Sequence, residues 1–417
     1  MTRSAHRDAD VIVVGGGPAG ASTAWSLARA GIDVLVLDRA HFPRDKVCAE
    51  YLSPQASRIF SDMGVLEEIE AAGAAQLAGM HLHAPNAETV DAEFAGVKGF
   101  AAFRNRGLAL RRTVLDDILL RRARHAGARV EEGARVTDVT RDQRGRVTGV
   151  VAQAGNGAQR QIQSSVVVGA DGLRSVVGRR LGLVRTRRWP RRIGLVSHYR
   201  RVAGMRGMGE MHVDAHGYLG LAEVGHEVIN VAIVLPASRS AEISGDRERF
   251  FKSWIESRPH LAVRFREAEQ VSAVRATGPF NSVARRAYAP GAALVGDAAD
   301  FFDPFTGEGV YAALRGGEIV APFVIEALRA NGDGGLAALR AYEAARRKEF
   351  GGKWKLERII GMAIAFPSLI NHAARALSTR KEMADLLIGV AGDFVPAEAV
   401  LRPRFLFDLF LSPAIRN

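Results

Sequence analysis

Residues 10–20 read DVIVVGGGPAG, a short β-branched run followed by the pattern G-x-G-x-x-G. The run Asp10–Gly15 predicts a buried strand that ends at glycine, and Pro18–Ala30 predicts a helix closed by Gly31. A second apolar run, Val34–Leu37, predicts another strand, which ends at Asp38. Strand, helix and strand within about 30 residues indicate a βαβ unit with a parallel sheet.

The glycine pattern is the part of this unit that binds a dinucleotide. Gly15 permits the tight turn, Gly17 lets the backbone approach a pyrophosphate, and Gly20 allows close packing of helix on strand. The helix start, at Ala19, offers unpaired N–H groups and a positive dipole end to the phosphates. Asp38 follows 18 residues after Gly20, where an acid binds ribose hydroxyls. This unit alone does not separate FAD from NAD.

Composition sets the class of protein around this unit. Hydrophobic residues make up 47% of the 417 residues, enough for two lobes of a globular enzyme. The formal charge of +12 favours anionic ligands, but the arginines are scattered, so we expect no nucleic-acid partner. A single cysteine, Cys48, excludes an internal disulfide or a cysteine-based zinc site and is typical of a cytoplasmic protein. Without a run of about 18 apolar residues, membrane contact is at most peripheral.

The pattern of hydrophobic residues changes along the chain. Alternating runs between about Ile193 and Pro236 predict an antiparallel sheet, and Ala292–Val295 returns to a buried strand. We therefore expect an α/β fold in which a discontinuous Rossmann-type domain is interleaved with an α+β substrate domain. The expected Rossmann segments are 1–75, 100–190 and 275–330, the substrate segments are 76–99 and 191–274, and a helical C-terminal region covers 331–417.

Two later motifs each follow a predicted strand. Gly169-Ala170-Asp171-Gly172 is the first, and Val295-Gly296-Asp297-Ala298-Ala299, followed by 302–309 (FDPFTGEG), is the second. With the glycine pattern before them, they resemble the flavoprotein superfamily of aromatic hydroxylases, flavin halogenases and geranylgeranyl reductases. The resemblance implies that the dinucleotide is FAD. It also implies that Asp297 lies near the ribityl chain and pyrophosphate, and that Arg112 lies near the cofactor.

The segment 42–50, FPRDKVCAE, indicates a branch of this superfamily. It resembles the P-R-x-K-x-C-G-E segment of geranylgeranyl reductases, which lies along the flavin, although Ala49 replaces the glycine. The W-x-F-P signature of that family is reduced here to Gly217–Ala222, without Trp or Pro, which puts prenyl specificity in doubt. The W-x-W-x-I-P signature of halogenases is absent from the sequence.

Candidate site residues follow from these motifs. Cys48 is either a small core residue or a contact of the flavin or substrate, and Tyr218 and His216 are candidate proton donors or packing residues. His81 and His83 share one strand face, but without a third ligand in view we expect no metal site. The expected FAD-binding residues are Gly15, Gly17, Ala19, Gly20, Asp38, Arg39, Arg44, Lys46, Arg112, Asp171, Gly296, Asp297, Pro304, Gly307, Glu308 and Gly309.

Three functions fit these features. The leading one is a reductase in which NAD(P)H, or an external redox partner, reduces FAD and the flavin reduces a carbon–carbon double bond. The alternatives are a flavin monooxygenase and a non-catalytic FAD-binding protein. The alternating sheet and the apolar tail residues Phe405, Leu406, Phe407, Leu409 and Phe410 favour a hydrophobic substrate. The tail is expected to close the cavity, rest on a membrane or pack on the FAD domain.

Overall fold

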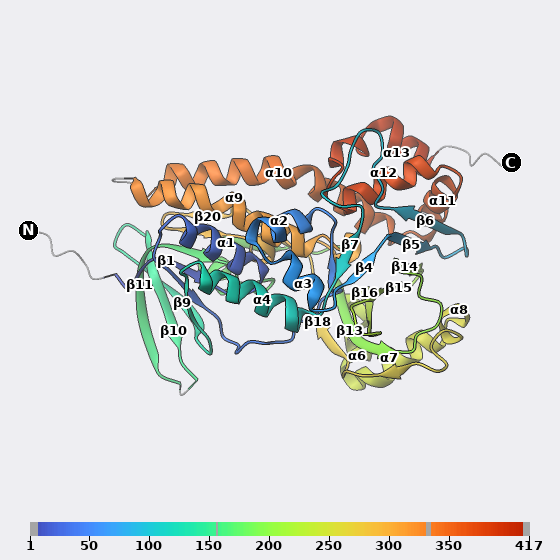
Figure 1. Cartoon of the computed structure of the whole chain (residues 1–417), viewed down its shortest axis with the longest axis horizontal. Helices are drawn as coiled ribbons and strands as arrows, with labels where there is room; N and C mark the ends of the chain where they lie inside the picture. Colours follow the sequence, from blue (N-terminus) through green and yellow to red (C-terminus); the bar gives the residue numbers. More distant parts are fainter. Residues whose placement is uncertain (1–6, 156, 331–334, 412–417) are drawn as a thin grey trace, which may run out of the picture.

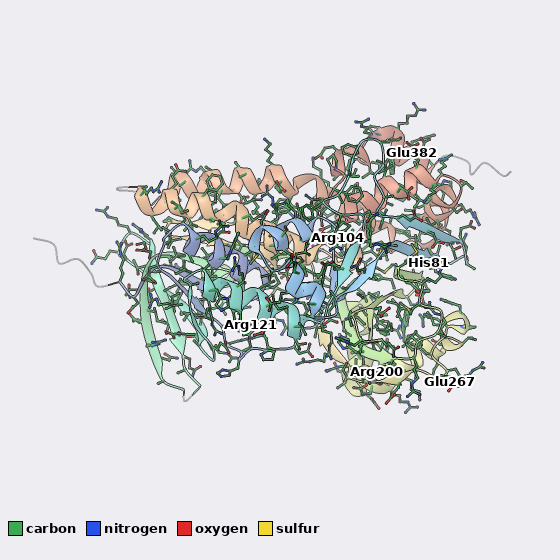
Figure 2. All side chains as sticks on the ribbon, viewed as in Figure 1. His81, Arg104, Arg121, Arg200, Glu267 and Glu382 are labelled. Carbon is green, nitrogen blue, oxygen red and sulfur yellow. The ribbon has the colours of Figure 1, made fainter. Side chains whose placement is uncertain are left out.

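The computed structural model describes residues 7–155, 157–330 and 335–411. It is an α/β protein with two large sheets side by side, and two long helices, α9 and α10, run along one edge of the molecule (Figure 1). The expected fold class is therefore confirmed. The outermost parts of the expected domains, residues 1–6, 331–334 and 412–417, lie outside the described residues. Figure 2 shows charged side chains of both signs spread over the molecule, including Arg121, Arg200, Glu267 and Glu382.

The first sheet contains the Rossmann unit. Its strand order is β20-β21-β11-β1-β2-β8, with every neighbouring pair parallel except β20 and β21. The inner strands are continuous apolar runs, which is typical of a parallel sheet whose two faces are covered. The strands are β1 (Ala9–Val14), β2 (Val34–Leu37), β8 (Arg129–Glu131), β11 (Gln159–Gly169), β20 (Tyr288–Ala289) and β21 (Ala292–Leu294); the covering helices are α1 (Pro18–Arg29), α4 (Arg112–His125) and α9 (Gly309–Arg329).

Strand β11 is longer than its apolar core. Its first half pairs antiparallel with β10 (Val147–Gln153), which forms a hairpin with β9 (Arg135–Arg141). These strands project from the lobe at the left of Figure 1. Only Val166–Val168 of β11 is a fully apolar run, and its outer half is polar and largely exposed apart from buried Ile162.

The second sheet has the order β17-β13-β16-β15-β14-β5-β6, with β18 paired to β13. Its pairs are antiparallel apart from β14 and β5. One face packs against short helices in a cluster that includes Leu219 and Ile233. The strands are β5 (Gly79–His83), β6 (Thr89–Glu93), β13 (Arg192–Arg200), β14 (Gly209–Asp214), β15 (Gly217–Glu223), β16 (Ile229–Pro236), β17 (Glu269–Gln270) and β18 (Arg275–Thr277); the helices are α6 (Ser240–Gly245), α7 (Arg247–Glu256) and α8 (Pro259–Ala262).

Smaller elements join the two lobes. A three-stranded sheet has the order β3-β7-β4, and β12 pairs with β19. These strands are β3 (Tyr51–Leu52), β4 (Ala75–Leu77), β7 (Gly107–Ala109), β12 (Val184–Thr186) and β19 (Ser282–Ala284); the short helices are α2 (Ala56–Met63), α3 (Leu66–Ala71) and α5 (Val176–Arg180).

The C-terminal region is helical. Its helices are α10 (Leu336–Ala363), α11 (Pro367–Ser378), α12 (Lys381–Ala391) and α13 (Pro403–Phe410). Leu409 is buried among residues of β6 and α11, whereas Phe407 is 54% exposed. The tail thus packs beside the second sheet, not on the Rossmann sheet as one alternative held, and none of its five apolar residues lines the central cavity. Among the described helices, none is long and apolar enough to cross a membrane.

Candidate active site

The glycine loop between β1 and α1 is closed by backbone contact. A Cβ on Gly20 would lie 1.8 Å from the carbonyl oxygen of Gly15, and Gly15 itself has φ +102°. The loop is also held by Asp38, whose Oδ2 accepts from the N–H of Gly16 at 2.7 Å and whose Oδ1 accepts from the N–H of Ala40 at 2.8 Å. Asp38 therefore shapes the loop in addition to any contact with a ribose.

Three cations lie beside this loop. A Cβ on Gly17 would lie 3.2 Å from Nη2 of Arg44. Arg112 donates to buried Asp116 through Nε (2.7 Å) and Nη2 (2.8 Å), and Arg44 Nη1 lies 3.0 Å from the same carboxylate. Lys46 lies 3.8 Å from Asp297; burial lowers the pKa of its ammonium, with Asp297 acting in the opposite direction. Two carboxylates thus face three cations, an excess of positive charge that suits a pyrophosphate.

The segment Cys48–Glu50 is fixed to the second sheet by buried hydrogen bonds. Glu50 has φ +61° and is 1% exposed. Its Oε1 accepts from the N–H of Arg112 at 2.9 Å, and its Oε2 lies 2.7 Å from Nε2 of His198. Asn230 donates at 2.9 Å both to Oε2 of Glu50 and to the carbonyl of Cys48. This network satisfies a buried carboxylate and sets the path of the segment along the cavity.

Asp171 lies behind the glycine loop and caps α5. Its Oδ2 accepts from the N–H of Val176 at 2.5 Å, while Oδ1 is buried without a protein partner. Burial raises the pKa of this carboxyl, and its hydrogen bonds counteract the rise. Asp171 itself does not line the cavity, although its neighbours Ala170 and Gly172 do.

The second motif forms the opposite side of the cavity and ends where α9 begins. Asp303 accepts from the hydroxyl of Tyr218 at 2.6 Å and pairs with Arg192 at 2.5 Å. Burial, and then the charge of Asp303, raise the pKa of Tyr218 well above its ordinary value. The tyrosine thus holds its proton in a bond that joins β15 to this loop, rather than presenting it as a free donor. Gly307 has φ +73°, where a Cβ would meet the ring of Tyr51 at 2.7 Å.

Two glutamates lie together in the wall formed by α9 and α10. Glu308 lies 3.4 Å from Nζ of Lys353, which also pairs with Asp393. Burial raises the pKa of Glu308, and burial followed by the charge of Glu308 raises the pKa of Glu357 well above its ordinary value. Glu357 lines the cavity and is half-buried there, so it can hold a proton beside a ligand.

One cavity collects most of the expected residues. His216 is exposed in the turn after β14 and does not line it, because the turn carries its side chain to solvent. The other expected residues that do not line it are Gly15, Gly17, Gly20, Asp38, Arg39, Arg44 and Asp171. The three glycines form the loop itself, and Arg44 contacts that loop. The expected residues that line it are Ala19, Lys46, Cys48, Arg112, Tyr218, Gly296, Asp297, Pro304, Gly307, Glu308 and Gly309.

Sequence reasoning missed residues whose role depends on contacts far along the chain. Glu50 and Glu357 line the cavity, and Asp116 is the buried partner of both arginines. Asp116 had a signal, since it lies four residues after Arg112 and thus on the same helix face. Glu357 had none, because α10 reaches the cavity only through tertiary packing.

These features fit FAD. The glycine loop leads directly into the N-terminus of α1, and it leaves no room for a Cβ at Gly20. Cations lie beside this loop, as a bound pyrophosphate requires. A cavity runs from Pro18 and Ala19 at the start of that helix to Asp297 and the Pro304–Gly309 loop. Strands of the second sheet line it together with the loops that follow β11 and β21, so a dinucleotide held at the glycine loop would extend toward the second lobe.

Comparison with known proteins gives the class. Residues 8–351 match the model of an FAD binding domain, so the chain belongs to that family. It is similar to digeranylgeranylglycerophospholipid reductase 2 of Methanopyrus kandleri, with 30% identity over 93% of both chains. It is also similar to menaquinone reductase of Mycolicibacterium smegmatis, with 29% identity over 75% of both chains. The protein is an FAD-dependent oxidoreductase of the geranylgeranyl reductase-like branch.

Halogenases share the fold. A solved structure of a flavin-dependent brominase, in a triple mutant, superposes with a TM-score of 0.80 at 22% identity and covers 95% of this chain and 98% of its own. At that identity the likeness concerns the fold alone.

Proposed function

We propose that the protein uses reduced FAD to saturate a carbon–carbon double bond in an isoprenoid or quinone-type lipid. The names of the two reductase relatives support this substrate class, and similarity to the first extends over 93% of both chains. The observation that carries the proposal is the unlike character of the two sides of the cavity. One side holds the cofactor groups described above, and the other is an apolar sheet.

The apolar side comes from the second sheet and its neighbours. Strands β13, β14 and β16 supply aliphatic side chains, and two phenylalanines close the wall beside them. Such a surface binds a hydrophobic chain because burial of apolar area gains about 25 cal/mol per Å². The residues of this wall are Leu195, Val196, Met211, Val234, Phe280 and Phe301.

The residues of this chain have separate tasks in that reaction. Bound FAD, once reduced, supplies the hydride. Lys46 and Arg112 hold the negative charge of the cofactor, and the Glu50 network keeps Cys48 at the cavity wall. Glu357 holds a proton at its carboxyl and is the group that we assign to protonate the second carbon. The apolar wall excludes water from the reacting atoms.

The proposal includes the electron donor and the location of the protein in the cell. NAD(P)H, or a protein redox partner in its place, reduces the flavin. A lipid substrate requires at most peripheral contact with a membrane, in a protein that works in the cytoplasm.

Steady-state oxidation of NAD(P)H, coupled to product detection, tests the substrate class. Polyprenyl quinones and geranylgeranyl lipids should be turned over, and small hydrophilic acids should not. Turnover confined to the hydrophilic compounds would overturn the proposal. Oxygen uptake in step with an oxygenated product would instead assign the monooxygenase function.

A further inference from the structure

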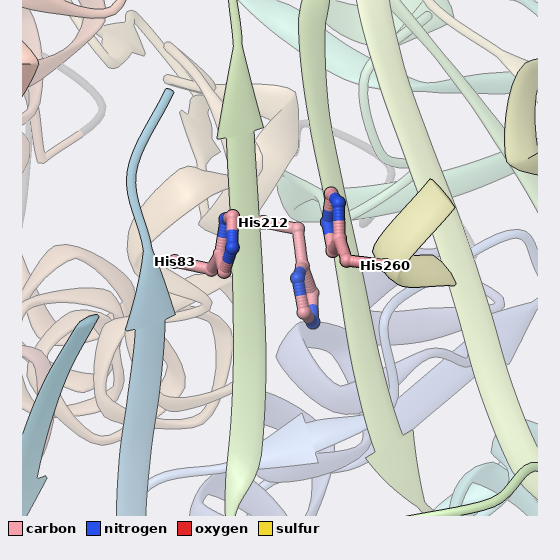
Figure 3. Close-up of side chains that lie close together, drawn as sticks. All are labelled: His83, His212 and His260. Carbon is pink, nitrogen blue, oxygen red and sulfur yellow. The ribbon is translucent and has the colours of Figure 1, made fainter. Parts of the chain in front are cut away.

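Three histidines lie together on the face of the second sheet that points away from the cavity. They come from three elements: His83 from β5, His212 from β14 and His260 from α8 (Figure 3). Their ligand nitrogens all lie within 4.8 Å of one another. The rings of His83 and His260 stack with centroids 4.2 Å apart, and the ring of His212 lies 5.5 and 5.3 Å from them. We call these residues the histidine cluster.

The register of the sheet explains how residues so far apart in sequence meet. β5 and β14 pair in parallel with His83 opposite His212, so the two imidazoles leave the same face. Met211, next in the chain, leaves the other face and lines the cavity. The sheet therefore separates the histidine cluster from the flavin cavity, and α8 covers the cluster from outside.

The hydrogen bonds of His212 leave one nitrogen available. Its Nε2 lies 2.9 Å from Oε2 of Glu210, and a carboxylate accepts, so Nε2 carries the proton in the neutral ring. The residue is only 5% exposed, and its Nδ1 is buried with no hydrogen-bond partner. A carboxylate that binds the far nitrogen of a metal-ligating histidine is the usual arrangement around transition metals.

We propose that the histidine cluster binds one transition-metal ion, with zinc as the best match, and that the ion ties α8 to β5 and β14. Imidazole is a preferred ligand of zinc, and three histidines plus water complete a tetrahedral site. Nitrogens bound at about 2.0–2.1 Å in such a site lie roughly 3.4 Å apart. The stacked rings of His83 and His260, whose planes are 8° apart, have to turn so that their nitrogens converge to this spacing, and the exposed His260 permits this by side-chain rotation.

The guanidiniums around the cluster are paired with carboxylates. Arg264 donates to Oε1 of Glu210 at 2.9 Å, and Arg206 and Arg258 pair with Asp91 and Asp214. Two of these carboxylates also bind histidines of the sheet, Glu210 to His212 and Asp91 to His81.

Zinc titration of the chelator-treated, FAD-loaded full chain tests the site. We expect one zinc per chain at micromolar concentration by calorimetry and elemental analysis, together with a rise in melting temperature, because a ligand of the folded state stabilises it. His260→Ala should weaken zinc affinity at least tenfold. His125→Ala, which removes an exposed imidazole from α4 in the other lobe, should leave it unchanged.

The result separates the cluster from the flavin site. FAD content should be the same in all three proteins, because the sheet lies between the two sites. Stoichiometric zinc bound equally by His260→Ala, or no stoichiometric zinc in the unaltered protein, would overturn the proposal.

Discussion

At the scale of single residues, the carboxylate of Asp297 carries the clearest prediction for the cofactor. It lies in the cavity wall, 3.8 Å from Lys46. Charge-assisted hydrogen bonds are worth about 1.5–3 kcal/mol each, so Asp297→Ala should weaken FAD affinity about ten- to a hundredfold. The measurement is the FAD dissociation constant from fluorescence titration of the apoprotein.

The control for this variant is Asp62→Ala, which removes a half-exposed carboxylate from α2. It should retain FAD as the unaltered protein does. Normal FAD affinity in Asp297→Ala would show that the Gly-Asp motif has another role.

Glu357 gives a prediction for pH dependence. Because its pKa is raised well above its ordinary value, the carboxyl keeps its proton to higher pH than a free glutamate does and loses it only as the pH rises through the raised value. If Glu357 protonates the substrate, kcat should fall on the alkaline side for this reason. A general acid typically contributes 10²–10⁴-fold, so Glu357→Gln should lower kcat by about that factor and remove the alkaline fall.

Glu349→Gln, on the same helix, is the matched control, because Glu349 pairs with Arg315 at 3.0 Å away from the cavity. It should keep both the rate and the pH profile. An unaltered profile in Glu357→Gln would remove this residue from the reaction.

How well single residues could be predicted depended on the range of their contacts. The glycines, Asp297 and Arg112 belong to local motifs whose geometry is fixed within a few residues. His216 is only two residues from Tyr218 in the sequence, yet the turn between β14 and β15 directs it to solvent, and sequence spacing does not reveal that difference. The sequence did not indicate that His212 would lie beside His83, because the parallel pairing of β5 with β14 joins residues more than a hundred positions apart.

At the scale of elements, the packing of α1 on the glycine loop is the feature most sensitive to substitution. A Cβ at Gly20 would overlap the backbone oxygen of Gly15, which cannot move aside without opening the loop. Gly20→Ala should therefore lower both the free energy of unfolding and the bound FAD. Urea denaturation and flavin absorbance measure the two effects.

Gly351→Ala is the comparison, since Gly351 lies within helix α10 with no atom within 4 Å of an added Cβ. That variant should keep its FAD and gain about 0.5–1 kcal/mol of stability from helix propensity. If Gly20→Ala behaves in the same way, close packing at the loop is not required.

The elements of the Rossmann unit could be read from the sequence almost to the residue. Val34–Leu37 has the predicted bounds, and the helix predicted over Pro18–Ala30 spans Pro18–Arg29, because apolar runs and glycines mark these elements sharply. Strand β11 begins at Gln159, well before its apolar run, because its polar outer half pairs with β10 of the hairpin. Periodicity identifies buried strands better than strands with one face in water.

At the scale of the whole molecule, the cavity depends on contacts that cross between the two lobes. Asn230 on β16 donates to the Cys48 segment, and Tyr218 on β15 donates to Asp303 before α9. The sequence could indicate that a sheet of this kind exists, but not which of its residues would bond to the cofactor loops. The sequence likewise did not predict where α10 and α13 would pack, because an amphipathic helix can pack on any available apolar face.

The most direct test of the account is an anaerobic single turnover. FAD in the purified protein is reduced with dithionite and mixed with a polyprenyl quinone or a geranylgeranyl lipid, and both flavin absorbance and product mass are followed. The account predicts that one flavin is oxidised for each substrate that gains two hydrogens, without oxygen. A flavin that stays reduced until air is admitted, with an oxygenated product, would contradict it.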